Sequence, residues 1–369
     1  MNRICLLCER TSVNENLYCQ EDYCPAELSP TILGYGEWIG DIEIIQAVSI
    51  LRSAVIYEAS HQKEKVFLKI AQPGQMHINK LKREAEFLRD LKQSKNQHAC
   101  LPKLLPPYVS TNVATDAYGK GMRGGQLIYF YLFTFSEGNT LRDLLRKRPQ
   151  LWLNHIGWLV ISLARTIEFL HEQGMYHCAI MPDAVLVRFD DKPEVPRILL
   201  LDLGVAASQS VMSNDWDPSF VLPAYTAPEL RLDILRPNSA TDVYGLGLTM
   251  YEMLIGQPVY TYSLLKDEAV YRAVERNRQA VMTRVDIQSV AKIAVQAVNQ
   301  TPSQRQKKPA VLIQQLIEQF GEIPTPTPSR WPTTETMQIF VGGLLLIAIL
   351  ILLLFTASDL VTDLLAVVP

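Results

Sequence analysis

Ile198–Gly204 reads ILLLDLG, an apolar run that ends in a single carboxylate and a glycine. Three other distinctive segments accompany it along the chain. VFLKI (Val66–Ile70) precedes it, while APE (Ala227–Glu229) and TDVYGLGLTMYEML (Thr241–Leu254) follow it. Such segments are very unlikely to occur in this order by chance, so the fold is interpreted from them outward.

Together these segments resemble the protein kinase family, and the resemblance covers about residues 39–320. Lys69, in VFLKI, occupies the position of the family's lysine that binds the α- and β-phosphates of ATP. Glu84 occupies the position of the helix glutamate that pairs with that lysine. Asp202 matches the aspartate of the family's DFG segment, which holds Mg²⁺ against the phosphates. The resemblance therefore implies a nucleotide site that includes these three residues.

The predicted elements agree with a kinase-like architecture. Strand-like segments and one helix, His77–Leu91, come first, and helical periodicity dominates from Leu151 to Phe320. This order is typical of an α+β protein with two lobes. We expect an N lobe at about 36–135 and a C lobe at about 136–320.

Three residues match positions that support the family's fold. The resemblance implies that Arg305 pairs with Glu229 of the APE segment. It also implies that Asp242 anchors the catalytic loop from below. All three residue types are retained, which favours an intact fold.

The catalytic loop departs from the family pattern. Aligning YHCAIMPDAVLV (Tyr176–Val187) with HRDLKPENILL places Ala179 on the catalytic aspartate, Met181 on the lysine and Ala184 on the metal-binding asparagine. Loss of a general base alone typically slows a reaction by about 10²- to 10⁴-fold. We expect no catalytic residue here, which indicates a pseudokinase. The alternative is an atypical active kinase in which nearby Asp183 substitutes for the missing aspartate.

The phosphate-binding loop departs as well. SILRSAVIYEA (Ser49–Ala59) matches the family's glycine-rich loop, with Ser49, Leu51 and Ala54 in place of its glycines. Glycine lets the backbone approach phosphates closely, so these side chains oppose nucleotide binding.

ATP binding therefore stays open at this point. Lys69, Glu84 and Asp202 favour it, as does an ordinary hinge in which the backbone from Thr134 to Ser136 would pair with adenine. The missing asparagine puts Mg²⁺ dependence in doubt.

Four cysteines lie within residues 1–29, in two close pairs: Cys5 with Cys8, and Cys19 with Cys24. Paired thiolates with a short spacer are typical of a closed, four-coordinate zinc site. We predict a zinc-ribbon-like module with a structural Zn²⁺. Two disulfides or four unrelated thiols are the alternatives.

The C-terminal part contains an uncharged stretch, MQIFVGGLLLIAILILLLF (Met337–Phe355). Its length suits a helix that crosses a bilayer once, which we place at 337–357, after a Pro-rich linker at 321–336 and before a short tail at 358–369. The weak charge bias around it puts the N-terminal body in the cytoplasm.

The amino-acid composition bears on the class of partner. The 369 residues carry 35 basic and 38 acidic side chains, a balance that argues against a nucleic-acid partner.

Three hypotheses about the function remain. The first is a membrane-anchored pseudokinase that acts as a signalling scaffold or nucleotide sensor. The second is an atypical active Ser/Thr kinase, and the third is a zinc-binding interaction scaffold without nucleotide. We expect protein partners and a membrane.

Overall fold

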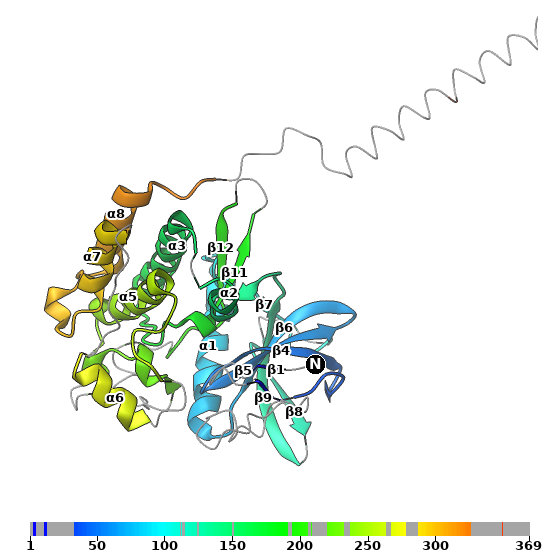
Figure 1. Ribbon diagram of the computed structural model, residues 1–369. Coiled ribbons are helices and arrows are strands. Elements are labelled where there is room, and N and C mark those ends of the chain that lie inside the picture. The colour runs from blue at the N-terminus through cyan, green and yellow to red at the C-terminus, as the bar shows by residue number, and fades with distance from the viewer. Residues whose placement is uncertain are drawn as a thin grey trace, which may run out of the picture. The chain divides into compact units, whose positions relative to one another are not determined.

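The computed structural model describes residues 3–4, 11–12, 33–110, 112, 115–123, 125–149, 151–190, 194–205, 208, 220–231, 237–262, 267–277, 287–325 and 349. The chain divides into two units, Met1–Pro324 and Thr325–Pro369. Within the first unit, a sheet with one long helix is followed by a mainly helical part (Figure 1). The predicted α+β, two-lobed arrangement is therefore confirmed.

The N lobe contains a seven-stranded antiparallel sheet. Its strands are β3 (Trp38–Ile39), β4 (Ile42–Ile50), β5 (Ala54–His61), β6 (Glu64–Ala71), β7 (Leu104–Leu105), β8 (Gly119–Arg123) and β9 (Gln126–Thr134). Their order is β3-β4-β5-β6-β9-β7, and β8 pairs with β9. The central position of β6 places Lys69 opposite Tyr131 of β9.

The two faces of this sheet are both buried, but in different clusters. Along β6, Leu68 and Ile70 belong to a cluster that contains only N-lobe residues. Phe67 points to the other face and joins a larger cluster that continues into the C lobe. Because side chains alternate along a strand, Lys69 lies on the same face as Phe67. The strand period therefore directs the lysine toward the C lobe.

Helix α1 (Gln75–Gln93) lies beside the sheet (Figure 1). Its buried apolar residues recur at helical spacing, at Leu81, Ala85, Leu88 and Leu91. The same buried face carries Glu84, so packing of the apolar stripe aims this carboxylate at the sheet.

The C lobe is mainly helical. Its helices are α2 (Leu141–Lys147), α3 (Leu153–Glu172), α5 (Ser239–Ile255), α6 (Asp267–Glu275), α7 (Gln288–Ala297) and α8 (Pro309–Phe320). Short 3-10 turns are η1 (Pro182–Ala184), η3 (Pro223–Tyr225), η4 (Pro228–Leu230) and η6 (Pro302–Gln304). A three-stranded sheet joins β10 (Asn139–Thr140), β11 (Val185–Phe189) and β12 (Pro196–Leu200).

Helix α5 is the central helix of this lobe and is buried along almost its whole length. Asn238 and Thr241 form a capping box at its start, and Gly256 ends it in the left-handed conformation. Asp242 lies in the first turn, where the helix dipole favours a negative charge.

Two predicted regions lie mostly outside the described residues. Near the N-terminus the structure describes only the backbone of β1 (Arg3–Ile4) and β2 (Thr11–Ser12), which pair antiparallel. Cys5, Cys8, Cys19 and Cys24 lie outside the described residues, as does 337–357 except Ile349. Among the residues that are described, no helix is both long enough and apolar enough to cross a membrane.

Candidate functional site

Lys69 and Glu84 form a buried ion pair. The ammonium of Lys69 lies 2.7 Å from both carboxylate oxygens of Glu84, and both side chains are 0% exposed. Glu84 also accepts hydrogen bonds from the Tyr131 hydroxyl at 2.9 Å and the Leu203 backbone N–H at 3.0 Å. The pairing implied by the resemblance is therefore present, and it joins β6, β9 and α1 to the segment after β12.

Asp202 lies against this pair and is paired with two lysines. One carboxylate oxygen contacts the ammonium of Lys69 and lies 2.9 Å from that of Lys80 on α1. The other oxygen accepts the backbone N–H of Gly204 at 2.9 Å. Sequence reasoning missed Lys80. Its position four residues before Glu84 on a predicted helix was the available signal, because such residues share one face.

The charges of this cluster are mutually compensated. Burial by itself raises the pKa of Asp202, but Lys69 and Lys80 outweigh it and hold the pKa well below the ordinary value. Burial likewise acts to lower the pKa of Lys69, yet Asp202 and Glu84 outweigh it and leave the pKa raised. Both groups are thus held in their charged forms.

The turn after Asp202 depends on a glycine. Gly204 has φ +63°, and a Cβ there would overlap the carbonyl oxygen and ring of His177. The ring Nε2 of His177 lies 3.0 Å from the Asp202 carbonyl oxygen, and its Nδ1 accepts the Ala179 N–H at 3.2 Å. Only a neutral imidazole protonated on Nε2 satisfies both contacts. Burial, the largest influence, accordingly lowers the pKa of His177.

The base of the catalytic loop is held from α5. One oxygen of Asp242 accepts the His177 N–H at 3.0 Å, and the other accepts the Cys178 N–H at 2.6 Å. His171 lies 2.7 Å from the same carboxylate. The anchoring role implied for Asp242 is thus present.

The predicted pair between Arg305 and the APE segment also forms. The guanidinium of Arg305 contacts both oxygens of Glu229, at 2.7 and 2.9 Å. Its side chain is 0% exposed and also donates to three backbone carbonyls, those of Ala240, Asn299 and Gln300. The contact between Glu229 and Arg305 that supports the family's fold is therefore retained.

The loop carries no reactive side chain where the family has three. Ala179, Met181 and Ala184 are all buried among apolar residues. The carboxylate of Asp183 is 3% exposed and pairs with the buried guanidinium of Arg142 at 3.2 Å. Arg142 in turn pairs with Glu252 of α5.

The end of β4 and the β4–β5 turn, which replace the glycine-rich loop, contact the C lobe directly. The Ser49 hydroxyl donates to the Asp183 carbonyl at 2.7 Å. Arg52 forms a bidentate pair with Asp267 of α6, at 2.6 and 2.7 Å. Leu51 is 2% exposed and belongs to the buried cluster that continues into the C lobe. The turn is therefore fastened to the C lobe and presents no open backbone cradle.

Aromatic rings pack together beside the hinge, on the face of the sheet that carries Lys69. The ring centroid of Phe67 lies 5.1 Å from that of Phe133 and 5.0 Å from that of Phe135. Thr134 is exposed and its N–H donates to the Lys103 carbonyl at 3.0 Å, so this donor is already used. The Ser136 hydroxyl donates to the Glu137 carbonyl at 3.3 Å. Sequence reasoning did not weigh Phe67, which is visible as the bulky residue of VFLKI.

The residues present do not fit Mg²⁺. This ion requires several oxygen ligands in a near-octahedral arrangement. Asp202 is already in contact with two ammonium groups, and Ala184 supplies no oxygen from its side chain. Among the described residues, no group of three or more His, Cys, Asp or Glu side chains is arranged to hold a metal ion.

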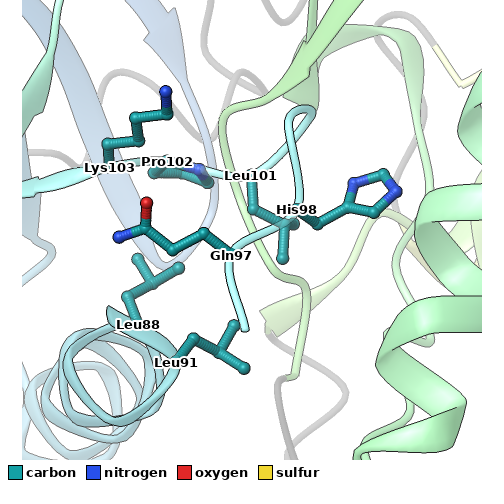
Figure 2. A pocket seen from close by; sticks show the side chains of 7 residues that line it. All are labelled: Leu88, Leu91, Gln97, His98, Leu101, Pro102 and Lys103. Atoms are coloured by element: carbon teal, nitrogen blue, oxygen red, sulfur yellow. The ribbon is translucent and has the colours of Figure 1, made fainter. Parts of the chain in front are cut away.

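A hollow elsewhere in the N lobe includes none of these residues. Figure 2 shows it between the end of α1 and the following loop, lined by Leu88, Leu91, Gln97, His98, Leu101, Pro102 and Lys103. The His98 ring stacks near Phe169, at 5.1 Å between centroids, and burial lowers its pKa.

Comparison with known proteins agrees with this geometry. The model of the protein kinase domain matches residues 52–367, which is more than half of the chain. The chain belongs to the protein kinase family. This kinase-like chain retains the family's Lys–Glu pair, DFG-like aspartate and APE contact, while its catalytic loop is apolar at three positions.

Several curated protein kinases are similar to part of the chain. Mitogen-activated protein kinase 15 of Caenorhabditis elegans is 29% identical over 195 residues, covering 50% of this chain and 39% of that protein. Serine/threonine-protein kinase PAK 5 of Rattus norvegicus is 27% identical over 182 residues, covering 49% and 23%. Serine/threonine-protein kinase 16 of Homo sapiens is 24% identical over 233 residues, covering 59% and 73%. The chain thus spans less than half of the first two relatives.

A solved structure supports the fold alone. The kinase domain of Mycobacterium tuberculosis PknI, crystallised as a double mutant, has a TM-score of 0.54 and 18% identity to this chain. The likeness covers 78% of this chain and 99% of the PknI chain.

Proposed function

We propose that this chain is a pseudokinase that acts as a signalling scaffold and does not transfer phosphate. The observation that carries the proposal is the catalytic loop, where Ala179 stands in place of the general base and is buried. Met181 and Ala184 add the loss of a cation and of a metal ligand. Contacts that support the fold, including the Glu229–Arg305 pair, are retained although the catalytic residues are replaced, which supports a structural role for the domain.

The geometry of Asp183 argues against an active alternative. A general base must come within about 3 Å of the hydroxyl that it deprotonates. The carboxylate of Asp183 is 3% exposed and faces a buried guanidinium, that of Arg142. Moving it into the cleft would break this buried pair and leave Arg142 with Glu252 and Tyr225 as partners. Breaking a buried ion pair is destabilising, by up to about 3–5 kcal/mol in comparable cases.

The contacts beside the hinge and at the β4–β5 turn favour a scaffold without bound nucleotide over a nucleotide sensor. The ring of Phe67 packs on Phe133 and Phe135, beside the hinge expected to receive adenine. The β4–β5 turn is fastened to Asp183 and Asp267 where phosphates would pass. A nucleotide would have to displace both sets of contacts.

Partners, the zinc site and the membrane remain part of the proposal on sequence grounds. Four cysteines within 1–29 support a zinc module, and the uncharged stretch within 337–357 supports an anchor. A scaffold at the cytoplasmic face of a membrane would place both modules near other proteins.

Phosphate transfer is tested with radiolabelled ATP on the full-length protein, with a generic substrate and with Mg²⁺ or Mn²⁺. We expect no incorporation above that of the Lys69→Ala variant. A label that depends on Lys69 would overturn the proposal. Thermal melting with ATP, with and without Mg²⁺, separates the two pseudokinase versions, because only a nucleotide sensor is stabilised by ATP.

A further inference from the structure

Lys80 is a buried lysine that faces the position at which the family's aspartate would bind a metal. It projects from α1 and its side chain is only 3% exposed. Its ammonium lies 2.9 Å from one oxygen of Asp202 and 3.9 Å from Glu84, four residues along the same helix. A buried ammonium is costly unless paired, so the fold holds this cation between two carboxylates.

The contacts of Asp202 leave little capacity for another cation. One oxygen is shared by the ammonium groups of Lys69 and Lys80, and the other accepts the Gly204 N–H. The carboxylate is 4% exposed. An ionised carboxylate offers about four acceptor positions in total, and three are used here by donors of this chain.

The charge of the cluster points the same way. Lys69 and Lys80 carry two positive charges and Glu84 and Asp202 carry two negative charges, so the cluster is formally neutral without a metal. A divalent ion at Asp202 would lie close to two ammonium groups in a site from which water is largely excluded. Its repulsion from them would be screened far less than at the surface.

We propose that Lys80 is the resident counter-ion of Asp202 and takes the place of a divalent cation, so that this site excludes Mg²⁺ and Mn²⁺. The inference deepens the proposed function, since a cleft without phosphotransfer needs no metal. It assigns a role to a residue of α1 rather than to the altered catalytic loop. Lys80 joins α1 to the DFG-like segment with no bound ligand.

Mn²⁺ binding to the full-length protein, followed by electron paramagnetic resonance without nucleotide, tests this role. Wild type and Asp202→Asn should take up the same amount of Mn²⁺, because wild type binds none at Asp202. Lys80→Met combined with Ala184→Asn, which restores the oxygen ligand that Ala184 lacks, should gain a site at least tenfold tighter than that of Ala184→Asn alone, and the added substitution Asp202→Asn should abolish it. Lys82→Met removes the same charge from α1, where Lys82 faces the Tyr129 ring at 4.5 Å, and in combination with Ala184→Asn it should behave as Ala184→Asn alone.

Two outcomes would overturn the proposal. One is Mn²⁺ uptake by wild type that Asp202→Asn abolishes, and the other is a folded variant with Lys80→Met and Ala184→Asn that binds Mn²⁺ no more tightly than Ala184→Asn alone. If Lys80→Met does not melt cooperatively, the wild-type comparison with Asp202→Asn still decides. Mn²⁺ binding is measured without nucleotide and so does not depend on phosphate transfer. Either this prediction or the phosphate-labelling prediction can therefore be wrong while the other is right.

Discussion

The turn after Asp202 requires glycine at position 204. The φ of +63° at Gly204 disfavours any side chain, and a Cβ would also overlap the His177 carbonyl. We expect Gly204→Ala to lower the free energy of unfolding by more than the roughly 1–2 kcal/mol of a left-handed residue alone. Urea denaturation measures this.

Gly174 provides the matched control for that substitution. It has φ +72°, and a Cβ there would meet nothing within 4 Å. Gly174→Ala should therefore cost only about 1–2 kcal/mol. Equal losses for the two variants would contradict the crowding argument at Gly204.

Phe67 is the second residue whose size decides the site. Phe67→Ala would remove the ring that packs on Phe133 and Phe135, which costs about 3–5 kcal/mol for a buried aromatic side chain. The space created lies between Lys69 and the hinge. We expect adenosine to raise the melting temperature of Phe67→Ala but not that of wild type.

The adenosine measurement has a direct control. Phe169→Ala removes a partly buried aromatic residue of α3 that packs near His98, away from the hinge. Adenosine should not stabilise that variant. Stabilisation of wild type to the same extent as Phe67→Ala would mean that the ring does not fill the base site.

At the scale of elements, Arg142 links α2 to α5 and to the η1 turn. Its guanidinium pairs with Glu252 and Asp183. Because the side chain is only 3% exposed, solvent contributes little to stabilising its charge. Arg142→Met would leave two buried carboxylates facing each other. We expect the free energy of unfolding to fall by about 3–5 kcal/mol, as measured by chemical denaturation.

Arg146, one turn further along α2, serves as the comparison. It pairs with Asp143 at 3.4 Å and is 17% exposed. Pairs of this kind contribute about 0–1 kcal/mol, so Arg146→Met should have a small effect. If Arg146→Met were as destabilising as Arg142→Met, the buried network would not be the cause.

Element identity was predictable where the period was strong. The helix predicted at His77–Leu91 is present as α1, Gln75–Gln93, because its apolar residues recur at helical spacing. Strand VFLKI lies within β6. The pairing of the β4–β5 turn with α6 was not predictable, since Arg52 and Asp267 are separated by 215 positions and no local pattern connects them.

The same contrast applies to the site. The resemblance implied Lys69, Glu84 and Asp202 as site residues and the pairing of Lys69 with Glu84. The direct contact between Lys69 and Asp202 was not predicted. Nor was the contact between Ser49 and the Asp183 carbonyl, because it involves a backbone atom that any residue could present. The motifs therefore missed tertiary partners, together with Lys80 and Phe67, which lie beside the motif residues.

For the whole molecule, we expect stability to depend on pH through the buried His177 and the partly buried His98. Burial lowers the pKa of His177 and of His98 below the ordinary value of 6.5. Just below that value the unfolded chain binds protons that the folded chain does not, so stability falls as the pH falls. Asp202 does not contribute there, because its pKa is lowered and it is ionised in both states.

The expected loss between about pH 7 and about pH 5 is up to about 1.4 kcal/mol per pH unit for His177 and smaller for the partly buried His98. Urea titrations across this range measure it. His177→Gln keeps a side-chain N–H but removes the titration, so its slope should be smaller than that of wild type. A stability that is constant or increases on acidification would contradict the neutral assignment of His177.

The aromatic cluster at the hinge has a consequence for chemical biology. Compounds designed to occupy the adenine pocket of protein kinases need a flat space beside the hinge, where the rings of Phe67, Phe133 and Phe135 pack together here. Resins that carry immobilised broad-spectrum kinase inhibitors would therefore not retain this chain. Surveys of kinases that depend on such enrichment would undercount proteins built in this way.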